Sequence, residues 1–138
     1  MVKEFEVLSH TADIGIIAYG GAMKEAFANA ARGMFSLITE LDSVAEVERR
    51  DVELAAPNME DLLVAWLNEL IYLFDVENLL FRRFDITRLT ATDIKATCHG
   101  EKVDASRHPL KIGIKAATYH MLKIEKGKPV RLQVIFDI

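Results

Sequence analysis

The sequence predicts an α+β fold in a single domain, with two long helices packed on one face of a mixed β-sheet. Two segments place apolar residues three and four positions apart, as amphipathic helices do. Several other segments alternate polar and apolar residues, which is typical of strands. No repeat, low-complexity stretch or linker interrupts the 138 residues, so we expect one domain over residues 1–138.

The composition is that of an ordinary globular protein. Hydrophobic residues make up 51% and charged residues 28%, which excludes disordered, collagen-like and coiled-coil proteins. No apolar run approaches the roughly 20 residues of a membrane helix, and the N-terminus has no signal-peptide pattern. The single cysteine, Cys98, has no partner for an internal disulfide. We therefore expect a cytoplasmic protein with no membrane partner.

The charge is distributed unevenly along the chain. The net charge is −4, which is unfavourable for a dedicated nucleic-acid binder. Residues 1–78 carry 5 basic and 15 acidic side chains, and residues 79–138 carry 12 and 6, so the halves have net charges of −10 and +6. This asymmetry indicates either a two-faced surface that docks on a partner or an ordinary mixed surface.

The N-terminal part predicts a hairpin followed by a helix. Residues 3–7 alternate as a strand does, and residues 14–19 form a second, more apolar strand. The polar segment 10–13 lies between them. Residues 22–38 have apolar side chains at helical spacing, which predicts the first helix.

The rest of the chain predicts an extended segment, a second helix and five strands. Residues 44–55 are extended and charged. Asn58 is expected to cap the second helix, with Asp61 at the capping-box position and an apolar stripe up to Phe74. The remaining strands are expected at about 79–87, 92–99, 110–116, 119–125 and 130–137, with a hairpin turn at 126–129.

Motifs of the common enzyme classes are absent from the sequence. There is no P-loop, dinucleotide fingerprint, Gly-x-Ser-x-Gly elbow or His-Glu-x-x-His. Cys98 lies on an alternating strand with Ile94 and Ala96, which indicates a buried structural thiol rather than a nucleophile. The sequence therefore points to a protein that assists a partner.

Two internal polar segments need an explanation. His10-Thr-Ala-Asp13 lies between two hydrophobic strands, where it forms either a site or a tight turn in which Thr11 and Asp13 bind nearby amides. Lys115-Ala-Ala-Thr-Tyr-His120 places a charge, a hydroxyl, a phenol and an imidazole in strand-forming sequence. A strand with one polar face would also explain this second segment.

The C-terminal residues place two negative charges at the end of a buried strand. Asp137 and the α-carboxylate of Ile138 follow an apolar run that predicts a central strand. Carboxylates in apolar surroundings repel each other unless something neutralises them. If Asp13 lies beside them, a hard cation such as Ca²⁺ or Mg²⁺ is the natural counter-charge. The alternative is a salt-bridge cluster with Lys115 or a histidine.

The chain resembles the archease family over essentially its whole length. The matching features are His10-Thr-Ala-Asp13 with Gly15, Lys115-Ala-Ala-Thr-Tyr-His120 after His108-Pro109, and the terminal Phe136-Asp137-Ile138. This resemblance implies a non-enzymatic factor that assists the GTP-dependent tRNA-splicing RNA ligase. That ligase uses manganese and forms a guanylated histidine, and archease promotes its guanylation and repeated turnover.

The resemblance also implies a metal site and further partners. Its ligands map to Asp13, Asp137 and the terminal carboxylate of Ile138, with calcium as the expected cation and magnesium or manganese as alternatives. His10, Thr118 and His120 would then surround the ion or contact the partner. A tRNA cytosine methyltransferase is an alternative partner, whose specificity or aggregation the protein would modulate, and contact with tRNA is expected to be weak or indirect.

Two other classes of function remain open at this point. A metal-dependent hydrolase would use His10 or His120 as a general base over the same carboxylates. A general protein-stabilising chaperone would instead present an exposed apolar patch.

Overall fold

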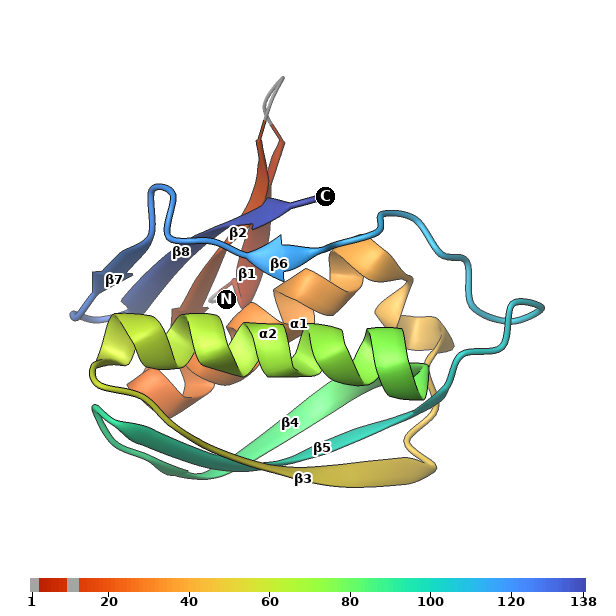
Figure 1. The fold of residues 1–138 in the computed structure, drawn as a ribbon. Helices are drawn as coiled ribbons and strands as arrows, with labels where there is room; N and C mark the ends of the chain where they lie inside the picture. Colours follow the sequence, from red (N-terminus) through yellow and green to blue (C-terminus); the bar gives the residue numbers. More distant parts are fainter. Residues whose placement is uncertain (1–2, 10–12) are drawn as a thin grey trace.

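The computed structural model describes residues 3–9 and 13–138 and shows three layers, in which two β-sheets enclose two helices (Figure 1). The first sheet contains five strands in the order β1-β2-β8-β6, with β7 also paired to β8. The second sheet has the order β3-β5-β4. The elements are β1 (Phe5–Ser9), β2 (Ile14–Gly20), α1 (Met23–Ile38), a 3₁₀ turn (Leu41–Ser43), β3 (Glu48–Ala55), α2 (Met59–Glu77), β4 (Leu79–Leu89), β5 (Asp93–Lys102), β6 (Ala116–Ala117), β7 (Lys123–Glu125) and β8 (Val130–Asp137).

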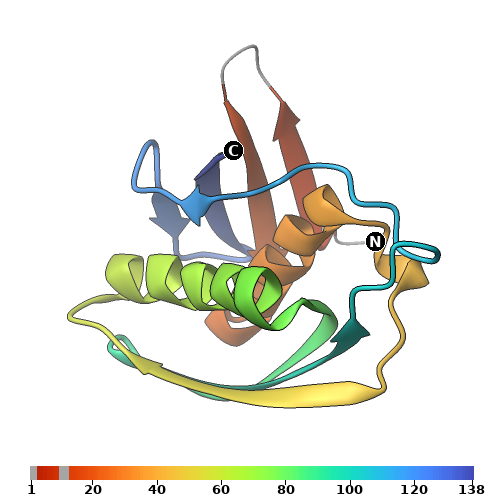
Figure 2. The ribbon, with the colours of Figure 1, turned by 45° about the vertical axis from the view of Figure 1, so that its right-hand side comes forward.

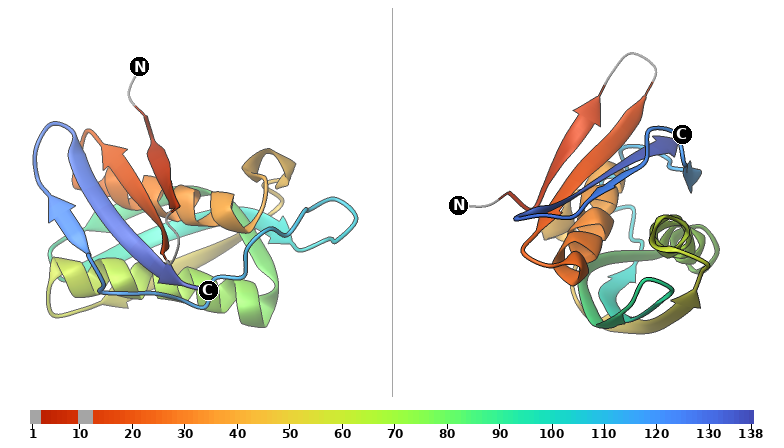
Figure 3. Two further views of the ribbon diagram at one scale, coloured as in Figure 1. Left: turned by 90° about the horizontal axis from the view of Figure 1, so that it is seen from above. Right: turned by 90° about the vertical axis from the view of Figure 1, so that its left-hand side faces the viewer.

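The α+β class is confirmed, but the arrangement of the sheets differs from the prediction. All described ladders are antiparallel, and they form two sheets instead of one mixed sheet. The helices lie between these sheets, as the turned views show (Figures 2 and 3). The physical reason is that α2 is buried over more than one face, so it needs a layer on each side.

The core joins the helices to both sheets through large apolar side chains. The Trp66 indole on α2 is fully buried and donates its Nε1–H to the carbonyl of Phe27 on α1 at 3.1 Å. Phe84 on β4 packs against Trp66 and Phe35, with ring centroids 5.9 Å apart in both pairs. These contacts fix the two helices to each other and to the second sheet.

The ends of α2 follow the chemistry expected from its sequence. Asn58 caps the helix, since its Oδ1 accepts the Asp61 amide at 2.8 Å. The Asp61 side chain does not complete a capping box, because its Oδ2 accepts from the Asn58 side chain at 3.2 Å. The helix ends at Asn78, whose φ of 57° is a left-handed conformation that asparagine tolerates.

The segment before β8 forms less strand than predicted. Of the expected strands at 110–116 and 119–125, only β6 and β7 have ladder partners. Residues 109–115 instead cross to the end of α1, where the Lys111 amide donates to the Ile38 carbonyl and Thr39 Oγ1 donates to the Pro109 carbonyl, both at 2.8 Å. We call residues 109–115 the strap. It delivers the chain to β6, and β8 is a central strand as predicted.

A buried polar network fixes the beginning of the strap. Arg107 donates from both terminal nitrogens to Glu101, and the Ala45 amide donates to Glu101 Oε2 at 2.6 Å. The fully buried His108 ring accepts the Asp104 amide at Nδ1 and lies 2.9 Å from Glu101 Oε2 through Nε2. Since Nδ1 accepts a hydrogen bond, Nε2 carries the proton of the ring and donates a hydrogen bond to Glu101. The Arg107 contact holds the pKa of Glu101 at about 2.

No helix in the described part of the chain is long and apolar enough to cross a membrane.

Candidate functional site

Asp13 and Asp137 meet at one end of the first sheet. Ile14 pairs with Phe136 in the antiparallel β2–β8 ladder, so Asp13 and Asp137 occupy the next position outward on the two strands. Directly opposed residues project from the same face of a sheet. Both residues line one hollow of about 470 Å³, whose other lining residues are Thr118, His120, Ile135, Phe136 and Ile138.

A glycine lets β2 and β8 approach closely beside this pair. A Cβ added at Gly15 would lie 2.3 Å from the carbonyl oxygen of Val134 and 2.8 Å from Cδ1 of Ile135. Both distances are shorter than van der Waals contact, so a side chain would force the strands apart. Gly15 thereby helps to set the separation of the two aspartates.

The positive side chains near the carboxylates do not neutralise both of them. His120 Nε2 lies 4.0 Å from Asp13 Oδ2, which is the outer limit of an ion pair, and the His120 side chain is 60% exposed. Lys115 contacts Asp137 only through the backbone, where its amide donates to the Asp137 carbonyl at 2.8 Å. Within residues 3–9 and 13–138, no ion pair joins Lys115 to either aspartate. Among these residues, the salt-bridge cluster considered from the sequence is therefore represented by the 4.0 Å contact between His120 and Asp13 alone.

The other predicted site residues have different placements. Thr118 lines the hollow, but its Oγ1 donates to the Ile135 carbonyl at 2.8 Å, which ties the hydroxyl to the backbone. Ile138 lines the hollow and is 55% exposed. His10 lies outside the described residues, as do Thr11 and Ala12, so the tight-turn alternative for residues 10–13 also falls outside them.

The donors at this end of the sheet have the chemistry that a hard cation prefers. Asp13 and Asp137 offer carboxylate oxygens only, which suit Ca²⁺ or Mg²⁺ better than zinc. In the described part of the chain, no group of three or more His, Cys, Asp or Glu side chains is arranged to hold a metal ion. Ile138 lines the same hollow, so its carboxylate is a further oxygen that could join the two aspartates.

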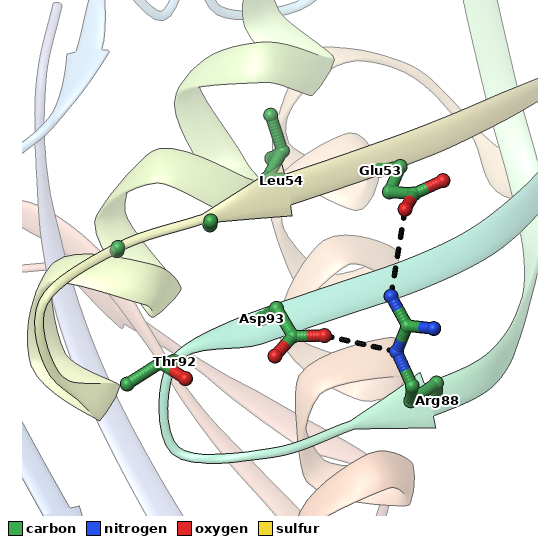
Figure 4. Close-up of a pocket in the computed structure, with 7 residues that line it drawn as sticks. Glu53, Leu54, Arg88, Thr92 and Asp93 are labelled. Atoms are coloured by element: carbon green, nitrogen blue, oxygen red, sulfur yellow. Dashed lines mark hydrogen bonds and ion pairs between the residues drawn. The ribbon is translucent and has the colours of Figure 1, made fainter.

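A larger hollow of about 620 Å³ lies at one end of the second sheet, where β3 ends and β4 turns into β5 (Figure 4). Its cation, Arg88, already lies between two carboxylates, with Nε 2.9 Å from Asp93 Oδ1 and Nη2 3.4 Å from Glu53 Oε1. A hydrogen bond from Thr90, followed by the charge of Arg88, lowers the pKa of Asp93. Because these charges satisfy one another, this hollow offers little to a ligand.

Three polar residues support the loop beside the aspartates through contacts that the sequence did not predict. Asn68 on α2 accepts the Ala117 amide at 2.8 Å, and Asp61 accepts the Tyr119 hydroxyl at 2.6 Å. Gln133 on β8 donates to the Met121 carbonyl at 3.0 Å. Gln133 alone had a signal in the sequence, as an amide inside an apolar strand. Burial raises the pKa of Cys98 to about 12, as expected of a structural thiol.

Comparison with known proteins identifies related chains that align over most of their length. The sequence model of the Archease protein family matches residues 5–138. Proteins named archease from Methanosarcina mazei and Pyrococcus abyssi are 41% and 40% identical; the alignments cover 99% and 91% of this chain and 97% and 90% of those proteins.

Solved structures show the same fold. The solution structure of Methanobacterium thermoautotrophicum protein 1598 aligns with a TM-score of 0.83 at 32% identity, over 99% of this chain and all of that one. The crystal structure of an archease, possible chaperone, from Thermotoga maritima aligns with a TM-score of 0.65 at 24% identity, over 95% of this chain and 94% of that one.

Proposed function

The chain belongs to the archease family, and from this membership we propose that it is a non-enzymatic accessory factor that binds a divalent cation and activates the GTP-dependent tRNA-splicing RNA ligase. In this role it would promote guanylation of the ligase and allow repeated turnover. The accessory role also agrees with the absence of a recognisable catalytic motif from the sequence.

The observation that carries the proposal is the opposition of Asp13 and Asp137 across the β2–β8 ladder. Two carboxylates that line one hollow repel each other, and each gains from a shared counter-charge. We propose that Asp13, Asp137 and the carboxylate of Ile138 hold the cation, with calcium as the expected ion and magnesium or manganese as alternatives. When bound, the cation would supply positive charge at the tip of an otherwise acidic group of residues.

The residues of this protein would present the cation to the ligase and would not themselves make or break bonds. The aspartates lie at the outer end of the β2–β8 ladder, which we call the corner of the first sheet, next to the C-terminus marked in Figure 1. We propose that this corner enters the mouth of the ligase active site, where it would order the metal and nucleotide for guanylation. His120 and the exposed Tyr119 flank the corner and would contact the ligase.

A turnover assay tests the proposal. Substoichiometric ligase is incubated with RNA ends, GTP and manganese, with and without the purified protein, and ligations per ligase molecule are counted. Native protein should raise turnover well above one and accelerate histidine guanylation. Asp137→Asn should lose most of this effect, whereas Asp75→Asn, which removes the same charge from an exposed position on α2, should retain it. Turnover that is independent of the native protein would refute the function.

The other proposed functions can be separated with the same preparation. Modulation of a tRNA cytosine methyltransferase stays a prediction of the family resemblance, and it requires a change in methylation pattern or aggregation of that enzyme. A general chaperone would prevent aggregation of unrelated proteins as well. A metal-dependent hydrolase would convert GTP or RNA without any partner, and we expect no such conversion.

A further inference from the structure

Gln133 is a buried amide in the central strand of the first sheet. It is 6% exposed, and its neighbours Leu132 and Val134 are almost completely buried. In the register it lies between Ile17 on β2 and Lys123 on β7. An amide in such surroundings is unfavourable unless its groups are hydrogen-bonded. A leucine at this position would bury apolar surface without the cost of burying a polar group. We therefore attribute the role of the amide to the hydrogen bond that it makes.

That bond holds an unusual backbone conformation in the loop of residues 118–122. Gln133 Nε2 donates to the carbonyl of Met121 at 3.0 Å. The φ of Met121 is 53°, a left-handed conformation that residues other than glycine and asparagine rarely adopt. Its side chain is 54% exposed, so burial of the side chain does not impose this conformation. Two hydrogen bonds stabilise it: the Leu122 amide donates to the Tyr119 carbonyl at 3.2 Å, which closes a turn around Met121, and Gln133 holds the Met121 carbonyl.

Three further hydrogen bonds attach the same loop to the rest of the protein. The amide and the hydroxyl of Thr118 both donate to the carbonyl of Ile135, at 3.0 and 2.8 Å. The Tyr119 hydroxyl donates to Asp61 at the first turn of α2, at 2.6 Å. The 118–122 loop is therefore attached through Thr118, Tyr119 and Met121. The residue that it presents between these attachments is His120, which faces Asp13.

We propose that Gln133 is a positioning residue, which holds the 118–122 loop through the Met121 carbonyl and thereby keeps His120 directed towards the Asp13–Asp137 corner. The conformational part of this proposal is independent of the protein's function. Its functional part rests on the proposed activation of the ligase, because a loop held rigid before binding loses less conformational freedom when a partner docks on it.

Hydrogen exchange measured by NMR tests the conformational part. In Gln133→Met, which keeps the length of the side chain but removes the donor, the amides of Thr118, His120 and Leu122 should exchange roughly tenfold faster. Amides of the β2–β8 ladder should be unchanged. Gln133→Asn keeps the amide but is too short to reach Met121, so it should reproduce the effect if the methionine variant does not fold.

A second substitution separates positioning from packing. Met121→Gly adopts a left-handed conformation without strain, so adding it to Gln133→Met should restore much of the slow exchange. Thr39→Val serves as the matched control, because it removes a buried side-chain donor to the Pro109 carbonyl far from the loop, and it should leave exchange at 118–122 unaltered. Loop exchange within twofold of native in both Gln133 variants would overturn the proposal.

The functional part is read in the ligase assay. Gln133→Met should bind calcium as the native protein does but stimulate ligase turnover severalfold less, with partial recovery in the double variant. If the native protein fails to stimulate the ligase, the proposed function is refuted while the exchange experiment still decides the role of Gln133. If Gln133→Met loosens the loop and stimulates the ligase fully, the loop has no part in activation.

Discussion

Asp13 and Asp137 lie opposite each other because the β2–β8 ladder ends at the pair Ile14 and Phe136. Their adjacency is thus a property of the backbone register, which places two negative charges at one corner. Among the residues that the structure describes, the one ion pair there is the 4.0 Å contact between His120 and Asp13. A side-chain substitution can therefore change the charge of this corner without altering the ladder that forms it.

We expect Asp137→Asn to bind calcium at least tenfold more weakly than the native protein, because it removes a charged ligand and keeps the shape. Asp13→Asn should have the same effect. Calorimetric titration with calcium measures the change. In addition, saturating calcium should raise the melting temperature of the native protein more than that of either variant. Equal affinities in all three proteins would exclude these aspartates as ligands.

The fold could be predicted from the sequence where the signal is local. The periodicity of residues 22–38, the Asn58 cap and the apolar run of β8 each correspond to an observed element. The strap has the composition of a strand, but its backbone bonds go to the end of α1, which no local pattern reveals. The presence of two sheets could not be predicted either, because it depends on the burial of α2 on several sides.

The sequence pointed to residues of the candidate site, but it did not show how the fold brings them together. Polarity beside apolar strands marked Asp13, Asp137 and His120. The pairing of β2 with β8 joins residues more than a hundred positions apart, and its register is fixed by packing across the sheet. The bond from Gln133 to Met121 depends on a turn whose geometry the sequence does not disclose.

Gly15→Ala should destabilise the protein by about 2 kcal/mol or more, because the added Cβ would meet the Val134 carbonyl at 2.3 Å. Separation of the strands should also weaken calcium binding, although no ligand is changed. Urea denaturation and calorimetry report the two effects. Gly113→Ala is the control, since its Cβ meets no atom within 4 Å, and it should change neither property.

Glu101→Gln should lower the free energy of unfolding by about 2 kcal/mol near neutral pH, because it leaves Arg107 and the buried His108 without their charged partner. The folded pKa of Glu101, about 2, lies below its ordinary value of 4.5. The stability that this carboxylate contributes is therefore complete above pH 4.5 and is lost as the pH falls through 2.

The difference between native and Glu101→Gln protein should accordingly shrink as the solution is acidified. Urea denaturation at about pH 7, 5 and 3 follows this change. Glu125→Gln removes an exposed pair with Arg131 and should cost no more than about 0.5 kcal/mol at any of these pH values. A pH-independent difference for Glu101→Gln would show that the loss comes from packing.

Direct affinity for tRNA should be weak, with a dissociation constant no tighter than about 10 μM at physiological salt. Four basic residues of the C-terminal half that could contact RNA are already paired with carboxylates: Arg82, Arg83, Arg88 and Lys111. Fluorescence anisotropy over a salt series measures the affinity. Tight binding that survives physiological salt would contradict this expectation and make Lys115 the first residue to replace.

Extension of the chain beyond Ile138 provides the sharpest test of the cation site. If the carboxylate of Ile138 is a ligand, a C-terminal tag converts it into a peptide carbonyl, which keeps an oxygen and loses the charge. The tagged protein should then bind calcium roughly tenfold more weakly, although every side chain is native.

Amidation of Ile138 should reproduce this loss without the bulk of a tag, whereas a tag at the N-terminus should not. The strands should remain paired, since β8 hydrogen bonding ends at Asp137, and thermal melts without calcium should therefore coincide. A salt-bridge cluster would respond differently, with lower melting temperatures in all aspartate variants and no calcium response in any protein. If the C-terminally tagged and amidated proteins bind calcium as tightly as the native chain, Ile138 is not a ligand and the third oxygen must come from elsewhere.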